Sequence, residues 1–440
     1  MALNKRNINN IFYIFVTTHL LLWTVVPTIT NSNLPLDVIE ALAWGSNLDW
    51  GFNKHPPGSA FFPEVFFQLF GPQDWAFYLL SQIFVVSSFY IVFKFSNEIL
   101  NNGILSLLSI FLLEGIFFYN FTTPEFNVNV CQLPFWTLTV YFSWKIYNSK
   151  EIKFTDCLLV GLCAAFGFLS KYLFIYLLAS IKLMFIYLLF FKKDRKFDFK
   201  YLIVIEVFII VLVPHLIWLN SNNFITITYG LSRTGLEQSS LIDHIKFPLI
   251  FLIKQVGLLI PFLFLFWLLV KKIKLDFNFK DKKLFFLLVI NILPIILIFL
   301  TSVTTGSKIR TMWMTPFYLF FGTLFVYLFQ TQINIKKLKS FMVGFIFLFF
   351  LSPILYAYVS ISNNDKRTDY PGKEIAIKTQ YAWDQQFKSK INVVYGNEWN
   401  AGNLSYHLKS RPVWEGPVEK KKLDQLKDYM CLDSICVGSR

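Results

Sequence analysis

Long apolar runs are the feature that most constrains how this chain can fold. Runs of about 20 residues recur along the sequence, which is the length that a helix needs to cross a bilayer, and the first lies at 11–29. Only 15% of the residues are charged, against about 25% in ordinary soluble domains. We therefore expect an all-α polytopic membrane protein.

About eleven of these runs are long enough to be transmembrane helices. They cover residues 10–30, 75–95, 103–120, 129–147, 155–170, 172–191, 201–219, 247–270, 284–302, 313–330 and 339–360. The first run follows Lys5 and Arg6 and lacks a small-residue cleavage site, so we expect it to remain as a transmembrane helix.

Basic residues are distributed unevenly over the loops between the runs. Alternate loops hold basic clusters, such as those at 192–200 and 271–283, whereas the opposite loops hold few cations. The positive-inside rule then places the N-terminus in the cytoplasm and, after an odd number of spans, the tail outside. These loops account for the net charge of +14, so membrane lipids are expected partners and nucleic acid is not.

The first outer loop, 34–62, collects ionisable residues directly after an apolar run. Asp37, Glu40 and Trp44 recur at i, i+3 and i+7, which places them on one face of a short helix at the membrane interface. The glycines and prolines of "GFNKHPPG" then force a turn that presents Lys54 and His55.

This loop has two interpretations. Carboxylates near the acyl boundary are costly unless they are solvated or paired, so they are candidates for function. A carboxylate can act as a general base, and Lys and His can hold an anionic phosphate. The alternative is a solvated surface helix with an ordinary Lys–Glu pair. Arg310, in another outer loop, suits either a bidentate phosphate contact or a lipid-headgroup anchor.

The polar tail differs in composition from the rest. Residues 361–440 have mixed charge and alternating apolar stretches such as "INVVYG". We expect two domains, a transmembrane domain at 1–360 and a small α/β extracytoplasmic domain at 361–440. Cys431 and Cys436 could pair if the tail lies in an oxidising compartment, and the five cysteines of the chain suggest no metal cluster.

Several motifs in order resemble those of one enzyme family. They are the acidic helix followed by "KHPPG", then "PEFNVNVCQLPFW" (124–136), "GLCAAFGFLSKY" (161–172), "PHLIWLNSNNF" (214–224) and the tail motif at 370–414. The chain resembles the C-type (GT-C) glycosyltransferases that use polyprenyl-phosphate sugar donors. Within them it is similar to bacterial relatives of the protein O-mannosyltransferases and of the lipid A aminoarabinose transferase.

The resemblance implies roles for the first outer loop. It implies that Asp37 is the catalytic base or orients the acceptor nucleophile, with Glu40 as its neighbour. The related enzymes place a Lys-Pro turn against the donor phosphate. This chain has Lys54-His55-Pro56-Pro57, so either Lys54 or His55 could take that role.

It also implies roles for four residues elsewhere. Glu125 is the acid of the second outer loop and is followed by Asn127, but a Glu after a proline is also a common helix start. Lys171 is implied as a donor-phosphate contact, although it could snorkel to the interface instead. His215 is a further cavity candidate, although a lone His is more often simply packed.

The activity implied is transfer of a sugar, with inversion, from a polyprenyl-phosphate donor to lipid A or another envelope glycolipid. The reaction would take place at the outer face of the bacterial inner membrane, with the tail in the periplasm. A protein hydroxyl is the alternative acceptor, and a lipid-linked glycan transporter is the alternative class. No cofactor is indicated with certainty, and a divalent cation is left open.

Overall fold

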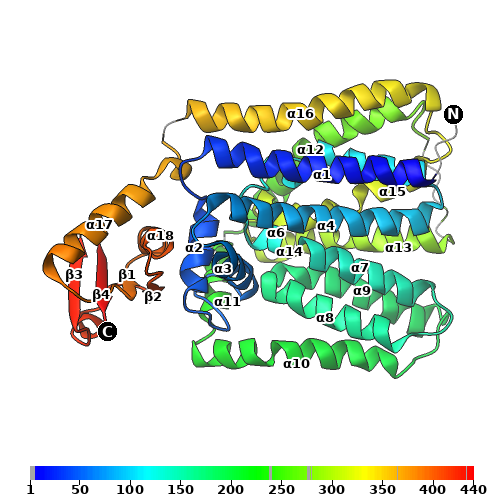
Figure 1. Ribbon diagram of the computed structural model, residues 1–440. Coiled ribbons are helices and arrows are strands. Elements are labelled where there is room, and N and C mark those ends of the chain that lie inside the picture. The colour runs from blue at the N-terminus through cyan, green and yellow to red at the C-terminus, as the bar shows by residue number, and fades with distance from the viewer. Residues whose placement is uncertain (1–4, 237–239, 275–277, 279, 364, 433) are drawn as a thin grey trace.

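In the computed structural model, a long helical body carries a smaller unit of helices and strands at one end (Figure 1). The structure describes residues 5–236, 240–274, 278, 280–363, 365–432 and 434–440. Residues 1–4, 237–239, 275–277, 279, 364 and 433 lie outside the described residues.

The helical body is formed by helices from α1 to α16. They are α1 (Lys5–Thr30), α2 (Leu36–Gly45), α3 (Gly58–Phe70), α4 (Asp74–Leu100), α5 (Gly103–Phe111), α6 (Val128–Cys131), α7 (Leu133–Asn148), α8 (Phe154–Ser170), α9 (Ile175–Ile186), α10 (Lys200–Ser221), α11 (Ile225–Ser232), α12 (Asp243–Leu269), α13 (Lys282–Asn291), α14 (Leu293–Thr305), α15 (Phe321–Phe329) and α16 (Leu338–Ser362). Short turns of 3₁₀ or π geometry join them, including η1 (Leu112–Gly115), η3 (Tyr172–Phe174), η6 (Thr311–Tyr318) and η8 (Arg367–Asp369).

Membrane-spanning length is reached by many of these helices. Among the described residues, 7 helices are long and apolar enough to cross a membrane, or up to 8 if the bent pair of η6 and α15 forms one span. The chain is therefore a mostly helical, multi-pass membrane protein, as the apolar runs predict.

The prediction of about eleven spans is not matched, because fewer of the described helices are long and apolar enough to cross a membrane. The run at 103–120 is helical only to Gly115, the run at 129–147 is divided between α6 and α7, and α8 has 17 residues. The side chain of Asn127 caps α6, and Pro134 occupies the first turn of α7. Caps and prolines start new helices within apolar sequence, which hydropathy alone does not register.

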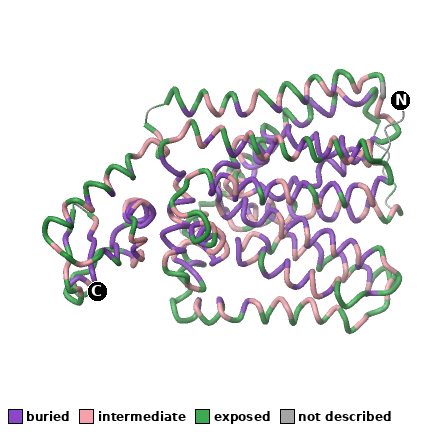
Figure 2. Tube along the Cα trace, in the orientation of Figure 1, coloured by how far each residue is buried: buried purple, intermediate pink, exposed green. Residues whose placement is uncertain are grey.

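The outward faces of the body are apolar. Along α10 and α16, which lie at opposite sides of the body, exposed residues alternate with less exposed ones (Figure 2). They include Ile210 and Ile217 on α10 and Phe347 and Ile354 on α16. Exposed apolar surface of this extent is expected where a protein contacts lipid rather than water.

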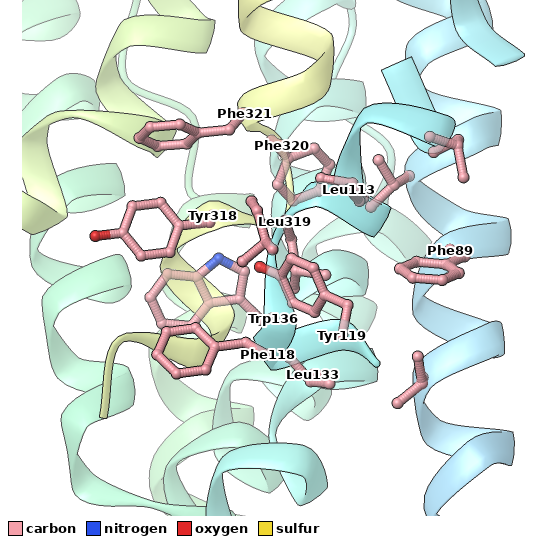
Figure 3. Close-up of a cluster of buried hydrophobic side chains, with 14 of the residues drawn as sticks. Phe89, Leu113, Phe118, Tyr119, Leu133, Trp136, Tyr318, Leu319, Phe320 and Phe321 are labelled. Atoms are coloured by element: carbon pink, nitrogen blue, oxygen red, sulfur yellow. The ribbon is translucent and has the colours of Figure 1, made fainter. Parts of the chain in front are cut away.

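The interior is built largely from aromatic side chains (Figure 3). Trp136, Tyr119 and Tyr318 are fully buried there. The hydroxyl of Tyr119 donates to the backbone oxygen of Thr315 at 2.8 Å, and that of Tyr318 donates to Gln255 Oε1 at 2.6 Å. Buried phenol groups need such acceptors, so these bonds fix how the apolar helices pack.

The C-terminal unit is a mixed sheet with short helices. Its elements are α17 (Gly372–Gln386), β1 (Val393–Tyr395), α18 (Asn400–His407), β2 (Val413–Trp414), α19 (Lys420–Leu423), β3 (Asp428–Leu432) and β4 (Ile435–Ser439). The strand order is β2-β1-β4-β3, with β1 parallel to β2 and the other pairs antiparallel. A disulfide joins Cys431 and Cys436 across the β3–β4 hairpin. The sheet confirms the prediction of an α/β tail.

Buried polar contacts hold this unit against α2, α3 and α4. Arg411 pairs with Glu64 at 2.5 Å, and its guanidinium lies 4.2 Å from the centre of the Phe67 ring. The Tyr406 hydroxyl donates to Asp74 Oδ1 at 2.6 Å. A buried charge that loses its only opposite charge is strongly destabilising, so these contacts fix the unit on the body.

We predict that Arg411→Ala weakens this docking. Loss of one partner of a buried ion pair typically costs about 3–5 kcal/mol, so the variant should unfold at lower temperature and be cleaved faster by protease between α16 and α17. Arg440→Ala is the matched control, because Arg440 pairs with Glu415 at the surface. Equal thermal stability and cleavage rates for the two variants would contradict the prediction.

Candidate active site

Helix α2 places two carboxylates at the end of the body that carries the C-terminal unit. Val38, Ile39 and Leu42 are buried on one side of α2, which turns Asp37 and Glu40 toward a different set of neighbours. The predicted sharing of a helix face by Asp37 and Glu40 follows from their i, i+3 spacing, and both line one small space in the fold.

Asp37 and Glu125 form a half-buried carboxyl pair. The backbone N–H of Asp37 donates to Glu125 Oε1 at 3.0 Å. Burial, together with the negative charge of Glu125, raises the pKa of Asp37 to about 7, against the opposing charges of Lys171 and Lys54. Burial also raises the pKa of Glu125. Two neighbouring carboxyl groups that are partly removed from water hold protons more tightly than they would in water.

A chain of polar contacts supports the loop that carries Glu125. Glu114 Oε1 lies 2.8 Å from His19 Nδ1, within the membrane-spanning part of α1. The side-chain amide of Asn120 donates to the backbone oxygen of Glu114 at 2.9 Å. Thr123 donates through its hydroxyl to the Asn120 backbone oxygen at 2.7 Å. The position of Glu125 is therefore set by polar groups buried deep in the body.

Lys171 is buried beside the carboxyl pair. It lies directly after α8, donates from Nζ to Asn129 Oδ1, and sits 5.3 Å from the centre of the Trp313 ring. Its side chain does not snorkel, since only 6% of the residue is exposed. Burial lowers the pKa of Lys171 to about 7, although the charge of Asp37 opposes this.

Lys54 lies between two carboxylates. Its Nζ donates to Glu40 Oε1 at 2.8 Å and is 3.4 Å from Glu398 Oε1, which belongs to the C-terminal unit. Asn53 also donates to Glu398 Oε1, at 2.7 Å. Burial lowers the pKa of Lys54, but the hydrogen bond and charge of Glu40 outweigh it and the pKa is raised overall. Burial likewise outweighs Lys54 at Glu40, whose pKa is raised.

His55 is neutral at neutral pH. Burial, followed by the positive charges of Lys171 and Lys54, lowers the pKa of His55 to about 3. The ring packs edge-on against Trp44 and Tyr229, with centroids 5.8 Å and 6.2 Å away. Of the two candidates in the turn, Lys54 carries the positive charge and His55 can offer a single N–H.

Arg310 lies further out, next to a second arginine. It directly precedes η6, and burial together with the nearby charge of Arg233 lowers its pKa. Arg233 stacks on Tyr229, with its guanidinium 5.7 Å from the ring centre. Arg233 also contributes to the low pKa of His55. Arg233 therefore lies near both Arg310 and His55. Arg310 itself is half-buried and not deep in the site.

Asn127 and His215 have mainly structural contacts. Asn127 Oδ1 accepts the backbone N–H of Asn129 at 2.8 Å and so caps α6, although its residue also borders the space beside Asp37. His215 bonds through Nε2 to the Tyr172 hydroxyl at 2.7 Å and through Nδ1 to the Trp50 backbone oxygen at 2.6 Å. His215 thereby holds the first outer loop against α10.

The space beside Asp37 is small. A cavity of about 10 Å³ is bordered by Asp37, Glu40, Trp44 and His55, which is less than a phosphate group requires. A larger cavity of about 420 Å³ lies on the side of Glu125 that faces α1 and α16. Among the described residues, no group of three or more His, Cys, Asp or Glu side chains is arranged to hold a metal ion.

Three charged residues of the site escape the sequence analysis. Glu398 meets Lys54 from the C-terminal unit, and Arg367 and Arg233 act electrostatically on Asp37 and His55. Each is far in sequence from the residue that it affects. Glu398 lies within the tail motif at 370–414, but nothing in that motif pointed to Lys54, and Arg367 and Arg233 lie in no distinctive motif.

We predict that Asp37→Asn raises stability at alkaline pH. The pKa of Asp37 is 3.8 in the unfolded chain and about 7 in the folded one, so the folded state binds the proton more tightly. The contribution of Asp37 to wild-type stability must then fall as pH rises from about 4 to about 7 and stay reduced above it. In detergent, the melting temperature of the variant should exceed that of wild type at pH 8, with the gap closing toward pH 4.

Asp424→Asn is the control, because Asp424 is exposed on the C-terminal unit. It should show no pH-dependent gap. A wild-type protein that is as stable as Asp37→Asn at pH 8 would refute the half-buried, proton-binding state of Asp37.

Sequence similarity to a known family covers only part of the chain, whereas similarity of fold to known structures covers nearly all of it. A family described as dolichyl-phosphate-mannose-protein mannosyltransferases matches residues 54–218. The match includes Lys54, Glu125 and Lys171 and begins after Asp37 and Glu40. No curated protein sequence matches the chain at a significant level.

Two crystal structures of ArnT from Cupriavidus metallidurans are similar in fold, one bound to undecaprenyl phosphate and one in the apo state. Their TM-scores are 0.67 and 0.62, each at 11% sequence identity over 94% of this chain and 86% of the ArnT chain. The resemblance drawn from the motifs is thus confirmed: residues 54–218 match the dolichyl-phosphate-mannose-protein mannosyltransferase family, and the chain has an ArnT-like fold.

Proposed function

We propose that the protein is a membrane glycosyltransferase that moves a sugar from a polyprenyl-phosphate donor to lipid A or another envelope glycolipid, with inversion. The observation that carries this is the half-buried Asp37–Glu125 pair next to the buried Lys171. A base and a cation held together in a partly desolvated site suit transfer from a phosphate leaving group. The ArnT-like fold supports it, since ArnT was crystallised with undecaprenyl phosphate.

The site is proposed to face the periplasm of a bacterial inner membrane. In this topology the N-terminus is cytoplasmic, and residues 361–440 form a periplasmic domain on a transmembrane domain at 1–360. The disulfide between Cys431 and Cys436 supports an oxidising compartment for the tail. Lys145 and Lys283 lie at the other end of the body, beside α4, where cytoplasmic charges are expected.

The reaction is a single displacement at the anomeric carbon. The acceptor hydroxyl oxygen bonds to that carbon while the bond from carbon to phosphate oxygen breaks, and the phosphate leaves with the electron pair. Asp37 takes the hydroxyl proton or orients the hydroxyl. A base is most effective when its pKa is near the working pH, and the pKa of Asp37 is raised to about 7. One displacement inverts the anomeric configuration.

The leaving phosphate requires cations. Lys171 and Lys54 are proposed to bind it, with Arg310 at the outer edge, and His55 can add a hydrogen bond as a neutral ring. Lys54 already holds two carboxylates, Glu40 and Glu398. An incoming phosphate must therefore share Lys54 with them, and Glu40 then positions the ammonium group. The residues of the site leave a divalent cation open, and no step above depends on one.

A protein hydroxyl is the second candidate acceptor. It is favoured by the description of the family that matches residues 54–218, whose members are named as protein mannosyltransferases. The donor chemistry and the proposed roles of Asp37 and Lys171 are the same for either acceptor.

Mass spectrometry of the envelope identifies the acceptor. We predict that deleting the gene removes one sugar mass from a glycolipid pool such as lipid A and leaves the glycoproteins unchanged. Restoring the gene on a plasmid should return the sugar, and an Asp37→Asn copy should not. A sugar lost from glycoproteins instead would establish the second candidate, and no change in either pool would contradict the proposed function.

We predict that substitutions of Asp37 and of Lys171 affect different quantities, the transfer rate and the donor affinity respectively. Asp37→Asn should lower the transfer rate by about 10²–10⁴-fold while leaving the affinity for undecaprenyl phosphate intact. Lys171→Met keeps the bulk but removes a charge-assisted hydrogen bond, so it should weaken that affinity by about 10- to 100-fold. Lys409→Met, at an exposed lysine, should change neither. Unaltered undecaprenyl phosphate binding by Lys171→Met in a titration would remove Lys171 from the phosphate site.

A further inference from the structure

A cavity of about 420 Å³ opens at the outer ends of α1 and α16. These two helices lie side by side along one edge of the body (Figure 1). Ser360 joins them by donating to the Thr30 backbone oxygen at 3.1 Å and to Asn31 Oδ1 at 2.5 Å. Asn31 also donates to the Tyr356 hydroxyl at 3.0 Å. The floor of the cavity is therefore polar and ordered.

Its walls are of two kinds. Leu36, Phe121 and Val359 make an apolar wall, and Val359 is 44% exposed on the lipid-facing side of α16. Glu125 and Arg367 make the charged wall. A cavity with apolar and charged walls beside the acyl boundary suits the headgroup of a lipid that enters from the side.

Arg367 and Lys366 are the two cations that line this cavity. Arg367 is exposed, and its guanidinium lies 5.8 Å from the centre of the Trp399 ring. No carboxylate lies within ion-pair distance of Arg367 in the part of the chain that the structure describes, whereas the adjacent Lys366 is 3.6 Å from Asp369. A planar guanidinium held by an aromatic ring is pre-organised to bind phosphate or carboxylate oxygens in pairs.

The carboxyl pair separates this cavity from the cations of the donor site. Glu125 lines the cavity, Asp37 borders the small space shared with His55, and the hydrogen bond between Asp37 and Glu125 joins the two sides. In a displacement, the nucleophile approaches the reacting carbon from the side opposite to the leaving group. The cavity is thus placed for the acceptor, as Lys54 and Lys171 are for the donor.

We propose that this cavity binds a phosphate or carboxylate group carried by the acceptor, with Arg367 as its principal ligand. The inference rests on the proposed function and deepens it, because it makes the acceptor an anionic lipid that enters between α1 and α16. An acceptor that offers only a neutral protein hydroxyl would bring no anionic group for Arg367 to bind.

The test compares Arg367→Ala, Arg367→Lys and the control Lys378→Ala, an exposed lysine on α17. Each is assayed for transfer to the polar lipids of the envelope, before and after phosphatase treatment. Arg367→Ala should raise KM for the untreated acceptor by about 10- to 100-fold, with undecaprenyl phosphate affinity unchanged. Arg367→Lys should fall between, because it keeps the charge but loses the paired contact. With phosphatase-treated lipid the variants should converge.

Three outcomes overturn the inference. An unchanged acceptor KM in Arg367→Ala removes Arg367 from the acceptor site. A parallel loss of undecaprenyl phosphate affinity assigns the cavity to the donor. Equal loss in Lys378→Ala reduces the effect to general surface charge.

A lipid-binding measurement, which needs no transfer activity, distinguishes failure of the proposed function from failure of the cavity proposal. If the wild-type protein transfers no sugar, its affinity for phosphatidic acid over phosphatidylcholine in lipid nanodiscs is compared with that of Arg367→Ala. A preference for phosphatidic acid that Arg367→Ala loses supports the anion cavity without any transferase activity. Equal affinity of the wild-type protein and Arg367→Ala for phosphatidic acid would refute the cavity proposal as well.

Discussion

The site depends on one contact, the hydrogen bond from the Asp37 backbone N–H to Glu125. It holds two half-buried carboxyl groups near each other, an arrangement that is unfavourable unless cations lie near or protons are retained. Lys171 is buried against this pair, and its own pKa falls to about 7. The charge state of the site is therefore shared among these residues and cannot be assigned to any of them alone.

Holding such a pair requires rigid support from both sides. On the inner side, Glu114 and His19 bury polar groups within the membrane-spanning body and anchor the loop before Glu125. On the outer side, Arg411 of the C-terminal unit bonds Glu64, and Glu398 of the same unit reaches Lys54. The C-terminal unit is thus a wall of the site, which explains why it is fixed by buried charge rather than tethered loosely.

How far the sequence predicts this structure depends on the distance between interacting residues. The helix carrying Asp37 and Glu40 was predictable because i, i+3 spacing is a local property, and most long spans were predictable from hydropathy. The contact of Lys54 with Glu398 joins residues that are 344 positions apart in the chain, and the neighbouring bond between Asn53 and Glu398 spans 345. No periodicity encodes such a contact. The neutral state of His55 likewise follows from burial and neighbouring cations, which only the fold reveals.

The lowered pKa of Lys171 has a consequence for phosphate binding. Lys171 has a pKa of about 7 because burial disfavours its ammonium form, so near neutral pH it is only partly charged. A phosphate bound beside it supplies negative charge and favours the ammonium form. If a donor phosphate binds there as proposed, its binding is coupled to uptake of a proton and its departure to release of that proton. The charge of Asp37, whose own pKa is raised to about 7, opposes the lowering of the Lys171 pKa. The proton balance of the proposed reaction therefore depends on Asp37 and Lys171 together.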